Sequence, residues 1–99
     1  MDEKTHKEIG EAFYQIQRSV HELRHYLIGR FNIEPNTVYL GHEEYMVIMS
    51  HTKHMSHTYF KTKEDGKSIL YFMGLEVERV IKDSHLDVSR VEGRTWYAE

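Results

Sequence analysis

Three histidines at a spacing of three residues are the first groups in this sequence that could do chemistry. They are His51, His54 and His57, in a polar stretch without hydrophobic periodicity. Neutral imidazoles are good ligands for zinc, nickel and copper, so these side chains form a candidate metal or small-ligand site. On a helix, a spacing of three drifts by roughly 60° per step, and a lasting site usually takes a further ligand from a distant element. A solvated loop explains the same residues, and no cofactor is expected.

Two other groups resemble catalytic arrangements in composition only. Ser84, His85 and Asp87 include a nucleophile, a base and an acid. Neighbouring residues on a turn or strand point apart, however, and cannot form a hydrogen-bonded relay. Glu76 and Glu78 would lie ~7 Å apart on one strand face, a separation found in glycoside hydrolases, but a solvated strand face is the simpler explanation. We therefore expect a protein without enzymatic activity.

The C-terminal segment combines aromatic and basic side chains. Arg90, Arg94, Trp96 and Tyr97 resemble in composition a stacking platform for single-stranded nucleic acid. The simpler interpretation is a tail that docks Trp96 onto the core or onto a partner. Residues 92–99 are therefore expected to form either a docked or a flexible tail.

These side chains must be positioned by a small number of elements, of which the longest is a helix predicted from Thr5 to Gly29. Its apolar residues recur at alternating steps of four and three. This stripe consists of Ile9, Phe13, Ile16, Val20, Leu23 and Leu27. Thr5 and Glu8 have the spacing of a capping box, and Gly29 occupies the position expected for a C-terminal cap. Phe31 and Ile33 are expected to close this end as small apolar plugs.

The length of this helix makes it a candidate interaction surface. About 23 helical residues reach ~35 Å, whereas a compact chain of 99 residues has a diameter of roughly 33 Å. The stripe therefore needs cover from the protein's own sheet, from a second copy of the chain, or from both. Tyr14 lies on the polar side with Arg18 and His21, and exposed aromatic–arginine pairs are enriched at interfaces. The predicted protein-binding residues are Phe13, Tyr14, Ile16, Val20, Leu23, Leu27, Trp96 and Tyr97.

The rest of the chain alternates between short strands and one further helix. Strands are predicted at 37–40, 59–62, 68–73, 75–81 and 86–89, and a helix at 42–50. Asp65 and Gly66 are typical of a tight hairpin turn, and Gly74 of a bulge or sharp bend. The order predicts a single α+β domain spanning residues 1–99. In it, the long N-terminal helix and the short second helix pack on one face of a mostly antiparallel sheet of about five strands.

The composition excludes several classes of protein. With 39% hydrophobic and 29% charged residues, the chain has the composition of a globular protein. Its net charge is -3 and its basic and acidic residues are interspersed, so the charge pattern does not favour binding to nucleic acid or to an anionic membrane. No apolar run approaches the ~20 residues that span a bilayer, and the absence of cysteine removes disulfides and thiolate metal sites. We therefore expect neither a membrane nor a nucleic-acid partner.

Four short segments resemble a known group of proteins. They lie at 35–41, 44–45, 73–77 and 85–88. Together they resemble small uncharacterised proteins encoded by tailed bacteriophages of Gram-positive bacteria. Their order of strand, short helix and glycine-turned strand pair is also similar to part of the A domain of the tailed-phage major capsid fold. The resemblance covers residues 35 to 88 and implies a phage or prophage origin but no reaction.

The leading hypothesis from these observations is a non-enzymatic protein-interaction module that is phage-encoded and acts as a homo-oligomer. Its partner would be a host or phage protein, which makes it a host-directed modulator or a small virion component. The expected location is the host cytoplasm or the virion. The alternative is a metal- or small-ligand-binding protein that uses the segment from His51 to His57.

Overall fold

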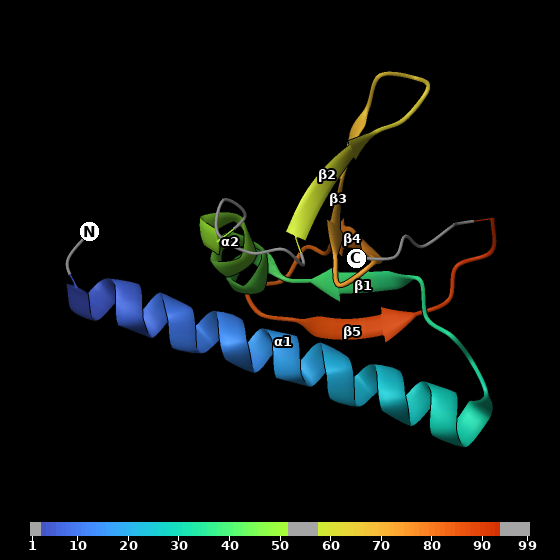
Figure 1. The fold of residues 1–99 in the computed structure, drawn as a ribbon, viewed down its shortest axis with the longest axis horizontal. Coiled ribbons are helices and arrows are strands. Elements are labelled where there is room, and N and C mark those ends of the chain that lie inside the picture. Colours follow the sequence, from blue (N-terminus) through green and yellow to red (C-terminus); the bar gives the residue numbers. More distant parts are fainter. Residues whose placement is uncertain (1–2, 52–57, 94–99) are drawn as a thin grey trace.

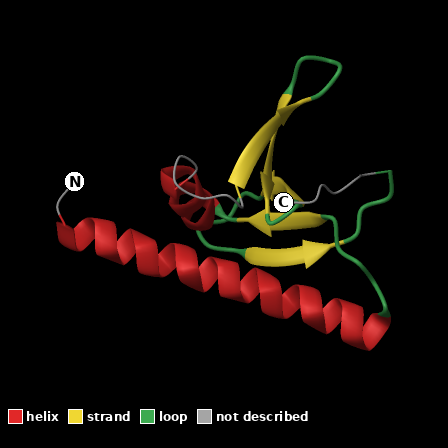
Figure 2. Ribbon diagram, viewed as in Figure 1, coloured by secondary structure: helices red, strands yellow, loops and turns green. Residues whose placement is uncertain are grey.

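The computed structural model describes residues 3–51 and 58–93, and in this part of the chain two helices and five strands are present. Figures 1 and 2 show their arrangement. The elements are α1 (Glu3–Phe31), β1 (Thr37–Leu40), α2 (His42–His51), β2 (Thr58–Thr62), β3 (Ser68–Phe72), β4 (Leu75–Arg79) and β5 (Leu86–Ser89). A long N-terminal helix, a second short helix and a five-stranded sheet confirm the predicted α+β class.

The sheet has the strand order β2-β3-β4-β1-β5. The pairs β2/β3, β3/β4 and β1/β5 are antiparallel, whereas β1 and β4 run parallel and align Val38 with Val77. A parallel pair needs a long crossover connection, and here α2 and the β2–β3 hairpin supply it. The sheet is therefore mostly antiparallel, as predicted, with one parallel pair at its centre.

A single apolar core lies between the helices and one face of the sheet. The strands contribute Val38, Leu40, Leu70, Phe72, Leu75 and Val88, and the helices contribute Phe13, Ile16, Val20 and Ile48. The strand residues occupy matching positions in the register, so they project from the same face. Both helices contribute to this one cluster, so they cover the same face, and α1 also contacts α2 and β5 directly.

The helix α1 runs along the whole length of the molecule (Figure 1). Its 29 residues correspond to about 43 Å of helix, and the longest dimension of the protein is 42 Å. The prediction that this helix spans the entire fold is therefore confirmed.

Both predicted ends of α1 are wrong by two residues. The helix already includes Glu3, so Thr5 lies inside it and does not cap it. At the other end, the helix continues past Gly29 to Phe31, and Asn32 adopts a left-handed backbone conformation with φ of 54°. Nested hydrogen bonds then close the helix, from the Asn32 N–H to the Ile28 carbonyl and from the next N–H to the Leu27 carbonyl. Asparagine tolerates this conformation better than most residues do, so it replaces the predicted glycine cap.

A two-residue turn joins β3 to β4. Met73 and Gly74 both have positive φ angles, 53° and 80°, which is the pattern of a type I′ hairpin turn. The predicted bend at Gly74 is thus present. The strand that follows ends at Arg79, earlier than predicted, and Ile81 is fully exposed in the next loop.

The buried side chain of Asn36 joins the start of β1 to the segment after β5. Its amide group donates to the Val91 carbonyl at 2.9 Å and accepts from the Val91 N–H at 2.8 Å. The same oxygen accepts from the Thr37 hydroxyl at 3.0 Å. The side chain therefore continues the β1–β5 ladder by imitating a backbone peptide group.

Replacing Asn36 by alanine is expected to lower the free energy of unfolding by about 1–3 kcal/mol, because buried partners would lose their hydrogen bonds. Urea denaturation measures this change. The matched control is Asn32→Gly, which also removes an asparagine side chain but keeps the left-handed turn, and it is expected to stay within about 0.5 kcal/mol of the wild type. Equal effects of the two substitutions would contradict the role assigned to Asn36.

Candidate functional site

The central part of the apolar stripe of α1 is covered by the protein's own sheet. Phe13, Ile16 and Val20 are buried, and the ring of Phe13 lies 5.7 Å from that of Phe72 in an edge-to-face arrangement. These three predicted protein-binding residues therefore belong to the core of the single chain and are not on its surface. Leu23 and Leu27 are only partly buried against this core, so cover diminishes toward the end of the helix.

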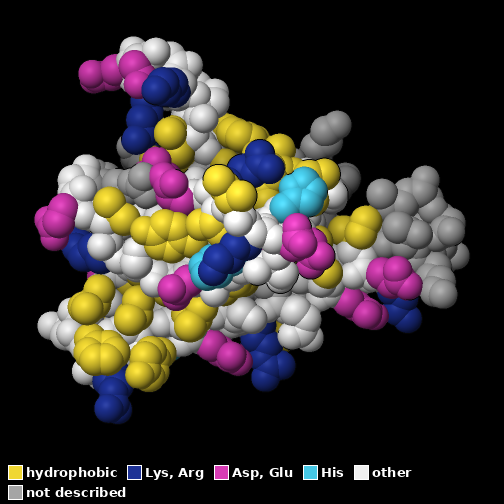
Figure 3. Space-filling view, turned by 180° about the vertical axis from the view of Figure 1, so that it is seen from behind, with side chains coloured by type: hydrophobic (Ala, Val, Ile, Leu, Met, Phe, Trp, Pro, Cys, Tyr) yellow, Lys and Arg dark blue, Asp and Glu magenta, His cyan; other side chains and the backbone are white. Residues whose placement is uncertain are grey.

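The end of α1 carries a group of large exposed apolar side chains. We call this group the apolar end of α1, and it consists of Tyr26, Ile28, Phe31 and Ile33. Figure 3 shows hydrophobic side chains gathered at this end of the molecule. The rings of Tyr26 and Phe31 lie 5.8 Å apart, and the Arg30 guanidinium is 5.9 Å from the Phe31 centroid. The predicted role of Phe31 and Ile33 as plugs is wrong, because they are 53% and 38% exposed.

A signal for this exposed group was present in the sequence. Phe31 follows Leu27 by four residues and so extends the apolar stripe by one further step. Because the helix was predicted to end at Gly29, the apolar stripe was not expected to continue to Phe31. Since α1 continues to Phe31, the stripe extends beyond the part of the helix that the sheet covers.

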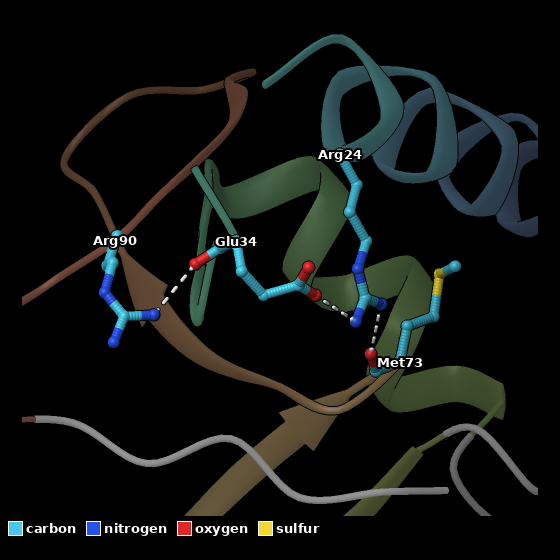
Figure 4. Close-up of polar contacts among 4 residues, drawn as sticks. All are labelled: Arg24, Glu34, Met73 and Arg90. Carbon is cyan, nitrogen blue, oxygen red and sulfur yellow. Dashed lines mark hydrogen bonds and ion pairs between the residues drawn. The ribbon is translucent and has the colours of Figure 1, made fainter. Parts of the chain in front are cut away.

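Arg24 holds the C-terminal part of α1 in a fixed orientation (Figure 4). Its guanidinium donates to the Met73 carbonyl and to a carboxylate oxygen of Glu34, each at 3.1 Å. The guanidinium of Arg90 donates to the Glu34 backbone carbonyl at 3.1 Å. These bonds join α1 to the β3–β4 turn and to the segment after β5. Neither partner of Arg24 was predicted from the sequence, since Met73 lies 49 residues away and Glu34 lies 10 residues away.

Tyr14 lies on the outer face of α1, where it is 60% exposed. Together with Gln17, Arg18, His21 and Met73 it lines a shallow hollow of about 380 Å³ between the helix and the β3–β4 turn. The predicted exposure of Tyr14 beside Arg18 and His21 is thus confirmed, whereas its binding role stays a prediction.

Glu76 lies on the face of the sheet opposite the helices, and the predicted solvated position is wrong. The residue is only 6% exposed because it occupies a central strand, in register between Tyr71 of β3 and Thr37 of β1, both of which are buried. The ammonium group of Lys63 lies 3.8 Å from its carboxylate. The carboxylate therefore has a cationic partner that the sequence pattern did not indicate.

Glu44, in the first turn of α2, binds the loop that precedes β5. One carboxylate oxygen accepts from the Ser84 hydroxyl and the other from the His85 N–H at 2.9 Å. Burial alone would raise the pKa of the Glu44 carboxyl, but these hydrogen bonds outweigh burial, so its pKa is lowered. A side chain at Gly41 would collide with this loop, since a Cβ atom would lie 2.6 Å from the His85 nitrogen. The Ser84 hydroxyl is thus engaged by Glu44, in agreement with a structural role for the turn.

Other predicted site residues fall outside the described structure. These are the side chain of His51 and the whole of His54, His57, Trp96 and Tyr97. Within residues 3–51 and 58–93, no group of three or more histidine, aspartate or glutamate side chains could hold a metal ion. Neither α1 nor α2 combines the length and the apolar character that crossing a membrane requires.

Comparisons of the chain with protein-family models, with curated proteins and with solved structures found no match. The function is therefore argued from the arrangement of the side chains. The strongest feature of that arrangement is the apolar end of α1, which is exposed and yet held in place by Arg24.

Replacing Arg24 by alanine is expected to lower the free energy of unfolding by about 1–3 kcal/mol, because partly buried acceptors on Glu34 and Met73 would lose their donor. Urea denaturation measures the loss. Arg18→Ala is the matched control, since its ion pair with Glu22 is on the same helix but highly exposed, and such pairs are worth at most about 1 kcal/mol. An Arg24 variant no less stable than the Arg18 variant would show that the Arg24 contacts do not secure the helix end.

The lowered pKa of Glu44 predicts a pH dependence of stability. Since its folded-state pKa lies below the unfolded value of ~4.3, its contribution is complete above that value and is lost as the pH falls through the folded-state pKa. The difference in unfolding free energy between wild type and Glu44→Gln should therefore shrink when the pH is lowered from 7 to about 3. The exposed neighbour Glu43 provides a control, as Glu43→Gln removes a charge from the same turn without breaking the hydrogen bonds to Ser84 and His85. A pH-independent difference for Glu44→Gln would contradict this assignment.

Proposed function

We propose that this protein is a non-enzymatic protein-interaction module that works through the apolar end of α1. The observation that carries the proposal is the exposure of four large apolar side chains, Tyr26, Ile28, Phe31 and Ile33, within eight residues of chain. Exposed apolar patches mark interaction sites in soluble proteins more often than single exposed residues do, and the rings of Tyr26 and Phe31 lie 5.8 Å apart. Two aromatic residues beside an arginine are also the types that dominate binding energy at interfaces.

The fixed geometry of this surface supports the proposal. A surface that is already ordered loses less conformational entropy on binding than a flexible one does. The contacts of Arg24 with Glu34 and Met73 hold the end of the helix, and the edge-to-face contact between Tyr26 and Phe31 orients their rings. A partner would therefore meet a preformed apolar surface.

A second copy of the chain is the partner that we propose. Homodimers with twofold symmetry place the same surface on both sides of the interface, so an apolar surface can be its own complement. The apolar end of α1 meets this requirement because all four of its members are uncharged, and Arg30 is placed to lie at its rim.

The biological setting is proposed from the resemblance of residues 35 to 88 to small proteins of tailed phages. On that basis, the chain is phage-encoded and is either a host-directed modulator or a small virion component. It would act in the host cytoplasm or in the virion, with a host or phage protein as a further partner. No membrane or nucleic-acid partner is proposed.

Sedimentation over a range of protein concentrations tests the proposal. The wild type is expected to form dimers, and Tyr26→Gln/Phe31→Gln is expected to weaken the dimer by at least about tenfold, because truncating a hot-spot aromatic costs ~2 kcal/mol or more. Both positions are exposed, so the variant should keep its fold, which circular dichroism can verify. Phe60→Gln is the control, since Phe60 is similarly exposed on β2, away from α1. A wild type that stays monomeric at every concentration, or a dimer equally weakened by both sets of changes, would contradict the proposed interface.

A further inference from the structure

His21 and His25 lie one turn apart on the outer face of α1. Both side chains are exposed, and their ring centroids are 4.3 Å apart. Residues four apart on a helix are neighbours on its surface, so the contact follows directly from the spacing. We propose that these two imidazoles together bind one late divalent transition metal ion, for which Zn²⁺ is the probe.

The geometry of the pair suits such an ion. Zinc–imidazole bonds are about 2.0–2.1 Å long, so two nitrogen ligands of a tetrahedral ion lie roughly 3.3 Å apart. With ring centroids separated by 4.3 Å and a tilt of 59° between the rings, the ring nitrogens can reach this separation by side-chain rotation alone. The regular backbone of α1 holds the two Cα atoms at a fixed distance, so metal binding requires no rearrangement of the chain.

The surroundings of the pair do not oppose a cation. The nearest arginines along the helix are Arg18 and Arg24, and each is paired with a carboxylate. Arg18 lies 3.2 Å from Glu22, and Arg24 lies 3.1 Å from Glu34. Their positive charges are therefore compensated locally. His21 also borders the hollow beside Met73, which leaves open space next to its ring.

Two imidazoles fill only half of a tetrahedral coordination shell. Among the residues that the structure describes, no cluster supplies a third histidine or carboxylate. The remaining positions are thus open to water or to a ligand from another molecule, which is the character of an open site rather than of a closed structural one. This proposal does not depend on the proposed function, because neither His21 nor His25 belongs to the apolar end of α1.

Calorimetric titration with Zn²⁺, combined with NMR spectra of the histidine side chains of the full chain, tests the proposal. The wild type should bind one ion that shifts the signals of His21 and His25 together. Loss of one of the two ligands should weaken binding by more than the ~10–100-fold that loss of an outer-shell partner costs. In His21→Ala the signal of His25 should therefore no longer shift at the Zn²⁺ concentration that shifts it in the wild type, and the converse should hold for His25→Ala. Mg²⁺, which prefers oxygen ligands, should leave both signals unchanged.

A spacing variant serves as the matched control. Arg18→His/His21→Ala keeps two histidines on the same face of α1 but separates them by ~10.5 Å along the helix, so it should not restore binding. A spacing variant that binds Zn²⁺ as well as the wild type would overturn the proposal. The proposal would also be overturned if Zn²⁺ left the signals of His21 and His25 unchanged and if a variant with alanine at His51, His54 and His57 lost all the heat of binding. That result would assign the metal to the polar segment instead.

Discussion

The packing of α1 against the sheet is the interaction on which the other features of this protein depend, and a mismatch of lengths limits it. The helix is about 43 Å long, whereas β1 and β5, which run roughly along it (Figure 1), have four residues each, or ~13 Å of strand. The strands can therefore cover only the middle of the helix. Phe13 and Val20 lie in this covered part, and Phe31 lies beyond it.

The two uncovered parts of α1 are supported in different ways. Toward the N-terminus, α2 contacts α1 and adds Ile48 to the shared core. Toward the C-terminus, no other described element packs apolar side chains against α1, and the hydrogen bonds of Arg24 hold the helix there instead. Hydrogen bonds of a charged group to partly buried acceptors orient the helix end without covering its apolar side chains. This arrangement explains how the end of α1 can be ordered and exposed at once.

The sequence was informative about which elements form, although both ends of α1 were predicted wrongly. Hydrophobic periodicity predicted α1 and α2, and the apolar run at residues 37–40 predicted β1 with its observed bounds. The failures away from the helix ends concern contacts between distant residues. The burial of Glu76 depends on its neighbours in β1 and β3, and Arg24 meets Met73, 49 residues away. The cap was also predicted wrongly, because Gly29 and Asn32 both tolerate the left-handed conformation and the local sequence does not decide between them.

The exposed group of Tyr14, Arg18 and His21, which the sequence predicted, continues along the outer face of α1. Tyr14, Arg18, His21, His25 and Ile28 follow one another at steps of four, three, four and three, and so they form a second line along the helix. A face that only contacts water is usually rich in lysine and glutamate, whereas tyrosine and arginine are enriched at interfaces and histidine is a frequent metal ligand. The residue types on this second line are therefore those expected for the metal site that we propose on this face, which is separate from the core-forming role of the inner face.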